Sequence, residues 1–393
     1  MIESNPFLYC DNLKEIEVAY GNPVFEDIEG VLFNKKDKEL LIYPTGREEC
    51  EYEIPSETKV VNGFAFGMCK NIESIFIPNG VTEMKGNPFA GCSNIRNIEV
   101  SSEKSLFDFD GSALIDKSKS RIICYVDSKL VNEYKICKGI AEIGDSAFSY
   151  CRYLTRIDMT DDVVRIGNNA FFSCTSLNSI GMSKNVRYIG DYAFADCTEL
   201  KKVEICDKTS HIGSRIFEYC YSLERVDFPD SVISMGEGIF ESCIALKYVT
   251  LPEKITDISN YMFSGCMSLK DISIPDSVKT IGKGAFDSCS ELEYIEIPVN
   301  VDSIGEFAFA RCDSLKNLEI PENIQKINRG TFYWSTGLKN VILHDEIKCI
   351  DDYAFYNCLN IILTVPRDSY AAKYAKENNL NYTYPDANDW LNN

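Results

Sequence analysis

The chain has 393 residues, with 40 Lys and Arg against 60 Asp and Glu, which gives a formal net charge of −20. This balance argues against nucleic acid as a partner, because a phosphate backbone requires clustered Lys and Arg. No run of 18 apolar residues occurs, and Met1 is followed by a polar segment rather than by a basic and then apolar signal region. We therefore expect no membrane insertion of this chain, and it carries no recognisable signal peptide or anchor.

A short phrase, Ala-Phe-x-x-Cys, recurs with a period of 23 residues. Such a period indicates a solenoid, because each coil buries its apolar face only against a neighbouring coil. It therefore predicts one elongated body in place of several globular domains. The recurring phenylalanines, here called the Phe column, are Phe7, Phe66, Phe89, Phe148, Phe171, Phe194, Phe217, Phe240, Phe263, Phe286, Phe309, Phe332 and Phe355. The Cys column, three residues later, is Cys10, Cys69, Cys92, Cys151, Cys174, Cys197, Cys220, Cys243, Cys266, Cys289, Cys312 and Cys358, with Ser335 as the single exception.

Each coil carries two apolar pairs after its column cysteine. The first pair, such as Ile272 and Ile274, has the period of a strand with one buried face, so it predicts a short strand in a parallel sheet along the solenoid. The second pair forms the opposite wall of the coil. A glycine such as Gly144 or Gly167 then turns the corner, where we expect a backbone with positive φ.

The chain starts in the middle of a coil. The strand expected from Leu13 to Val18 would have no earlier coil beside it, so its ladder groups and apolar core would be exposed. We therefore expect that the natural protein extends upstream. This chain should either fray over residues 1–18 or form an end-to-end dimer through its N-terminal edge.

The same extra unit is inserted twice, because Cys10 to Cys69 and Cys92 to Cys151 each span 59 residues, 36 more than one period. The insertions cover about residues 19–61 and 101–143. Both contain two apolar runs around a polar turn, which predicts hairpins. The expected hairpin strands lie at 30–33 and 40–43 in the first insertion, and at 113–115 and 122–125 in the second.

The last coil is altered after Cys358. Asp368 or Ser369 can cap a helix from about Tyr370 to Asn378, whose Ala371 and Ala375 share one face. This helix should cover the open end of the core. The expected organisation is a solenoid over residues 1–366 and a C-terminal cap helix and tail over 367–393.

The pattern V-x-x-I-G-x-x-A-F-x-x-C-x-x-L-x-x-I-x-I-P, complete from Val278 to Pro298, resembles the BspA-like (Treponema pallidum type) class of leucine-rich repeats. The resemblance covers nearly the whole chain, from Ile2 to Pro366. It implies an α/β-type leucine-rich-repeat solenoid, strand-dominated, forming a right-handed curved superhelix. It also implies, for many members, a bacterial or protozoan cell-surface or secreted protein that binds other proteins. The family has no catalytic motif.

The sequence offers no convincing site for catalysis, a cofactor or a metal. The only histidines, His211 and His344, lie far apart in the repeat, whereas zinc sites and nucleophilic thiols need clustered partners. Residues 108–111 have the look of a calcium loop but lack its later acidic ligand, so the start of a hairpin is the better interpretation. The column thiols should be buried and reduced, since in-register Cβ atoms stay about 4.8 Å apart, beyond disulfide range. Whether the five cysteines outside the column are reactive stays open.

The positions five and seven residues after each column cysteine point outward and are here called the strand face. Of the twelve seventh positions, seven are acidic, and a row of like charges needs counter-charges beside it. Arg156, Lys202 and Arg225 supply these only in the middle coils. The C-terminal half combines less compensated acids with aromatic residues, which suggests a recognition surface. The candidate binding residues are Tyr248, Asp271, Tyr294, Glu296 and Glu319.

These observations predict a non-enzymatic protein-binding or adhesion module whose partner is a protein, such as a host or matrix protein. A solvated face that merely resists aggregation is the other interpretation of the same residues. The resemblance implies a cell-surface or secreted location. The reduced thiols and the missing signal instead favour an intracellular leucine-rich-repeat scaffold.

Overall fold

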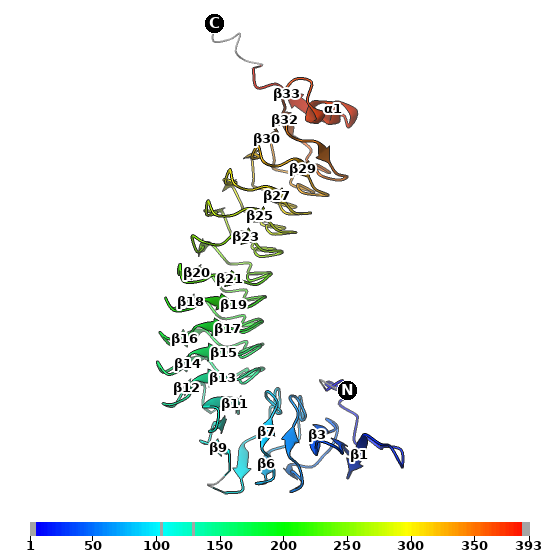
Figure 1. The fold of residues 1–393 in the computed structure, drawn as a ribbon, viewed down its shortest axis with the longest axis vertical. Helices are drawn as coiled ribbons and strands as arrows, with labels where there is room; N and C mark the ends of the chain where they lie inside the picture. The colour runs from blue at the N-terminus through cyan, green and yellow to red at the C-terminus, as the bar shows by residue number, and fades with distance from the viewer. Residues whose placement is uncertain (1–4, 103–104, 128–129, 387–393) are drawn as a thin grey trace. The chain divides into compact units, whose positions relative to one another are not determined.

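The computed structural model describes residues 5–102, 105–127 and 130–386. It divides into two compact units, residues 1–197 (unit 1) and 198–393 (unit 2). Each unit is a stack of coils in which equivalent strands follow one another along the stack (Figure 1). The predicted strand-dominated solenoid is therefore confirmed.

The strand predicted after the column cysteine is present in every described coil except the first. Equivalent strands pair in parallel and in register, as Arg225 with Tyr248 and Val226 with Val249. In unit 1 these strands are β4 (Glu51–Glu53), β6 (Ser74–Ile77), β8 (Asn97–Val100), β12 (Glu133–Lys135), β14 (Arg156–Asp158) and β16 (Ser179–Gly181). In unit 2 they are β18 (Lys202–Glu204), β20 (Arg225–Asp227), β22 (Tyr248–Thr250), β24 (Asp271–Ile272), β26 (Tyr294–Ile295), β28 (Asn317–Glu319), β30 (Asn340–Ile342) and β32 (Ile362–Thr364).

The opposite wall of each coil forms ladders of its own, which the apolar pairs alone did not predict. These two-residue strands also pair in parallel, as Thr280 with Ser303. In unit 1 they are β5 (Val60–Val61), β7 (Glu83–Met84), β13 (Glu142–Ile143), β15 (Arg165–Ile166) and β17 (Tyr188–Ile189). In unit 2 they are β19 (His211–Ile212), β21 (Ser234–Met235), β23 (Asp257–Ile258), β25 (Thr280–Ile281), β27 (Ser303–Ile304), β29 (Lys326–Ile327) and β31 (Cys349–Ile350).

The Phe column forms the centre of each core. Its rings stack on one another, with centroids 5.0 Å apart for Phe148 and Phe171 and 5.3 Å apart for Phe286 and Phe309. The side chains from Phe148 to Phe332 are fully buried. Phe7 is the exception, with 36% of its surface exposed. Its coil contacts residues 64–69 through Leu8 and Asn5.

Most column cysteines donate a side-chain hydrogen bond to the carbonyl of a column phenylalanine in the preceding coil. Cys174 Sγ donates to the carbonyl of Phe148 at 2.9 Å, and Cys289 Sγ to that of Phe263 at 3.1 Å. Ser335 fills the column because its Oγ donates to the carbonyl of Phe309 at 2.7 Å. All 17 cysteines are free thiols, which for the column cysteines agrees with the prediction. The expected burial of the whole column is wrong for Cys10, which is exposed in the first described coil, and only partly met by Cys92.

The corner glycines have a different role from the one predicted. The φ angles of Gly144 and Gly167 are not positive. A Cβ at Gly167 would instead lie 2.7 Å from the backbone nitrogen of Asp145 in the preceding coil. Glycine is therefore required by the close approach of two coils. The positive φ angles belong to the residues two before and two after the column phenylalanine, such as Asn169 (53°) and Ser173 (56°).

Both predicted hairpins are confirmed, and each gains a third antiparallel strand. The first insertion contains β1 (Phe25–Ile28), β2 (Val31–Asn34) and β3 (Glu39–Ile42). The second contains β9 (Phe107–Phe109), β10 (Ala113–Asp116) and β11 (Arg121–Tyr125). The last strand of each joins the wall ladder, β3 with β5 and β11 with β13. Tyr43 and Tyr125 then stack on Phe66 and Phe148 and so continue the Phe column across the insertions.

The strand expected from Leu13 to Val18 is wrong. This segment is extended but forms no strand ladder; Ile16 N donates to Gly30 O at 2.9 Å, and Val18 N to the side chain of Asp27. Ile16 and Val18 pack on the hairpin beside Leu32, Leu41 and Ile42. The insertion places its hairpin where the next coil would have paired. The dimer predicted through this edge stays a prediction.

The C-terminal helix is confirmed as α1 (Tyr370–Glu377), and Ser369 is its cap, accepting a hydrogen bond from Ala372 N. Ala371 and Ala375 are buried, and the ring of Tyr374 lies 6.4 Å from that of Phe355, the last of the column. The tail adds β33 (Asn381–Thr383), which pairs in parallel with β32 and which the sequence did not predict.

We expect Phe240→Ala to lower the free energy of unfolding by roughly 3–5 kcal/mol, because it empties a fully buried position between two stacked rings. Tyr248→Ala, on the outward face of β22, should change it by less than about 1 kcal/mol. Chemical denaturation of the two variants measures both values. Equal losses would contradict the assignment of inward and outward positions.

Native alkylation should modify the exposed Cys10, Cys50 and Cys137 first. The buried column thiols should react only in denaturant, because burial raises the pKa of groups such as Cys266 and removes the reactive thiolate. Peptide mass mapping after native and denatured labelling makes the comparison. Rapid native labelling of Cys266, or a disulfide within the column, would contradict the described packing.

Candidate functional site

The five candidate residues all lie on the outward face of unit 2. Tyr248 belongs to β22, Asp271 to β24 and Tyr294 to β26, while Glu296 directly follows β26 and Glu319 ends β28. All five side chains are exposed, with Tyr248 at 61% and Tyr294 at 60%. The alternation that places them outward buries Ile272, Ile295 and Leu318 beneath.

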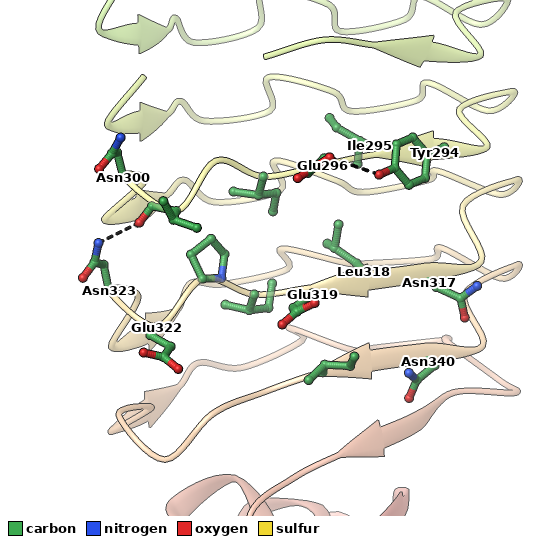
Figure 2. A pocket seen from close by; sticks show the side chains of 15 residues that line it. Tyr294, Ile295, Glu296, Asn300, Asn317, Leu318, Glu319, Glu322, Asn323 and Asn340 are labelled. Atoms are coloured by element: carbon green, nitrogen blue, oxygen red, sulfur yellow. Dashed lines mark hydrogen bonds between the residues drawn. The ribbon is translucent and has the colours of Figure 1, made fainter. Parts of the chain in front are cut away.

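The structure brings three of these candidates into one groove. The groove has a volume of about 770 Å³ and crosses three successive coils, from Tyr294 and Glu296 over Glu319 to Asn340 and Ile342 (Figure 2). A hollow of about 520 Å³ adjoins it and contains Asp271, while Tyr294 and Glu296 line both spaces. We call the larger space the strand-face groove. Tyr248 lines neither space.

Apolar side chains form much of the groove, and the candidate set had omitted them. Ile295, Leu318 and Ile320 are buried below it, whereas Val299 is 75% exposed and Ile342 37% exposed beside it. Ile342 occupies a seventh position, where most other coils carry an acid. This apolar residue could therefore have indicated from the sequence alone that Ile342 belongs to the groove. Val299, by contrast, lies in the loop after Pro298, outside the strand pattern.

The charge of the strand-face groove is negative. Its lining contains Glu296, Glu319 and Glu322 and neither Lys nor Arg. The Tyr294 hydroxyl donates to Glu296 Oε2 at 3.2 Å, and the negative charge of that carboxylate raises the pKa of Tyr294. Within residues 5–102, 105–127 and 130–386, neither Glu296 nor Glu319 forms an ion pair.

The middle coils confirm the predicted counter-charges. In unit 1, Arg156 lies 2.9 Å from Asp158. In unit 2, Lys202 lies 2.6 Å from Glu204 and Arg225 lies 2.7 Å from Asp227. In each case the cation stands two residues before the acid on the same strand, so both side chains point outward together.

The rest of the described chain shows little that could support chemistry. No group of three or more His, Cys, Asp or Glu in this part of the chain could hold a metal ion. Burial raises the pKa of the column thiols Cys243 and Cys312. The described helix is too short and too polar to cross a bilayer.

Comparison with solved structures supports the fold. A leucine-rich repeat protein from Eubacterium ventriosum is 28% identical, with 61% of this chain and 64% of that chain covered and a TM-score of 0.55. This chain therefore spans less than two thirds of that relative's length. One from Bacteroides ovatus is 21% identical, with coverage of 92% and 91% and a TM-score of 0.50. A leucine rich cell surface protein from Faecalibacterium prausnitzii is 21% identical, with coverage of 91% and 98% and a TM-score of 0.44, too distant to bear on location.

No curated protein matches the chain. A family model for the BspA type leucine rich repeat region matches in 6 copies, over residues 48–125, 121–247 and 233–362. These matches cover well over half of the sequence and include both units. The chain belongs to the BspA-type leucine-rich repeat family.

Proposed function

We propose that this chain is a non-catalytic protein-binding module and that the strand-face groove of unit 2 is its binding site. The observation that carries the proposal is the groove itself, where an exposed tyrosine and unpaired glutamates stand beside exposed apolar side chains. Tyrosine with an apolar centre and a polar rim is the usual composition of a protein interface.

The exposure of the side chains along the groove favours a polypeptide partner over a small molecule. Small-molecule sites enclose most of their ligand, whereas this groove is lined by exposed side chains from three successive coils. The strands that carry these side chains are each hydrogen-bonded in register to one neighbour, β26 to β24 and β28 to β30. A preformed surface loses little conformational entropy when a partner binds.

A catalytic role fits the same residues poorly. A nucleophile needs a nearby base, and the groove lining contains neither histidine nor cysteine. Its carboxylates sit in open surroundings, where general acid or base catalysis would need a perturbed group. We therefore propose binding without catalysis.

We further propose a cell-surface or secreted location, which the family resemblance supports. The 17 free cysteines favour the second candidate, an intracellular scaffold, since reduced thiols persist best inside the cell. Protease treatment of intact cells distinguishes the two. A surface protein should be cleaved without lysis, whereas an intracellular scaffold should be cleaved only after lysis.

The binding proposal predicts that the double variant Tyr294→Ala, Glu296→Gln loses affinity without losing stability. Peptides selected from a displayed random library against the whole chain serve as probes. The double variant should weaken their binding about tenfold or more, because a central tyrosine commonly contributes over about 1.4 kcal/mol. Its melting temperature should stay unchanged, since both side chains are exposed.

The matched control is Lys36→Ala, in the turn between β2 and β3 of the first insertion. It also removes an exposed side chain but lies in unit 1. Its binding should equal that of the unmodified chain. If Lys36→Ala caused the loss and the double variant did not, the binding surface would lie on the inserted hairpin instead.

A further inference from the structure

Compared with other strands of the strand face, the strands of the groove lack a cationic side chain beside their acid. The strand β18 places Lys202 two residues before Glu204, and β20 places Arg225 two residues before Asp227. In β28 the corresponding positions are Asn317 and Glu319, and at β26 they are Tyr294 and Glu296. The acids are therefore kept in the groove, while the cations that pair with them elsewhere are replaced by neutral side chains.

Lysines near the groove do not take over this role. Lys270 pairs with Glu293 at 3.6 Å, and Glu293 lies three residues before Glu296, outside the row of acids. Lys316 and Lys339 stand in the same outer row, directly before β28 and β30, and form no ion pair with Glu296 or Glu319 among the described residues. Lys279 lines a separate hollow beyond Asn300.

The unpaired acids lie beside apolar side chains that face solvent. Val299 and Ile342 are exposed in the lining of the same groove as Glu319. The ring of Tyr294 extends next to Glu296 (Figure 2). An occupant that satisfies this surface must therefore supply both positive charge and apolar area. A polypeptide segment that alternates basic and apolar residues has this composition.

We propose that the partner of the strand-face groove presents an extended segment with Lys or Arg next to an apolar residue. Its cations take the places that Lys202 and Arg225 occupy in their own coils, against Glu319 and Glu296. Its apolar side chain covers Val299 or Ile342. This inference rests on the proposed binding function and adds the chemical class of the partner.

The charge pairing in this site should govern selectivity and association rate more than total affinity. Glu296 and Glu319 are exposed, so each ion pair is weakened by water and by salt. Complementary charge nevertheless steers a basic segment toward the groove and disfavours an acidic one. Binding should therefore weaken as ionic strength rises.

The decisive variant is Asn317→Lys, which reproduces the Lys202–Glu204 arrangement inside the groove. The added lysine should pair with Glu319 and displace the partner's cation. Asn317→Gln is the neutral control at the same position. Ser303→Lys adds the same charge on the exposed opposite wall, in β27, and so controls for the change in net charge.

Three synthetic twelve-residue peptides with the same apolar residues serve as probes, carrying Arg, Gln or Glu at alternate positions. Fluorescence anisotropy gives their dissociation constants for the whole chain and its variants at low and high salt. The Arg peptide should bind most tightly. Asn317→Lys should weaken it about fivefold, the upper range for an exposed ion pair, and clearly more than Asn317→Gln does, while Ser303→Lys leaves it unchanged.

The possible results distinguish failure of this inference from failure of the proposed binding function. If the Gln peptide binds as well as the Arg peptide, and Tyr294→Ala weakens both while Asn317→Lys does not, the groove binds protein but its partner is not basic. If Asn317→Lys and Ser303→Lys weaken the Arg peptide equally, its binding reflects net charge alone, and the inference fails. If Tyr294→Ala changes the binding of no peptide, the proposed function fails as well.

Discussion

The close and regular contact between coils is the constraint on which both units depend. In each coil the Phe column must stack on its neighbours, and the corner glycine must admit the backbone of the preceding coil within van der Waals contact. Non-glycine residues such as Tyr192 and Asp196 hold positive φ angles on either side of Phe194, at a cost of roughly 1–2 kcal/mol each. The stacked rings and the two ladders offset that strain. Each insertion contributes a tyrosine that stacks on the next ring of the column, Tyr43 on Phe66 and Tyr125 on Phe148.

This constraint leaves the strand face as a surface on which side chains can vary without disturbing the core. In unit 2 the inward residue of each of these strands is Ile, Val or Leu, whereas its outward neighbours range from Arg225 to Tyr248 and Asp271. A charged row still has to be compensated. Lys202 and Arg225 form ion pairs with the acids of their own strands, whereas Glu319 forms no ion pair among the described residues. We attribute the difference between these coils to the proposed binding function, because the core beneath them is the same.

The sequence predicted what repeats and missed what depends on three-dimensional approach. The 23-residue period was enough to place β22, β24 and β26, the hairpin strands and the helix capped by Ser369. It wrongly predicted a positive φ at Gly167. Glycine is also needed where two backbones approach closely, and the sequence does not distinguish these two reasons. It also misjudged Leu13 to Val18, since only the structure shows that the hairpin takes the neighbouring position. The groove was partly visible in Tyr294, Glu296 and Glu319, but Val299 lies in a loop that no strand pattern covers.

The central claim is that a basic segment binds across β26 and β28 on the outward face. Hydrogen–deuterium exchange of the whole chain, with and without the arginine peptide, tests it most directly. The account predicts slower exchange at Tyr294–Glu296, Asn317–Glu319 and the loop at Val299. It predicts no change at Ser303–Ile304 and Lys326–Ile327, which belong to the same coils but form the opposite wall. Protection of the wall strands with none at Asn317–Glu319 would contradict the account.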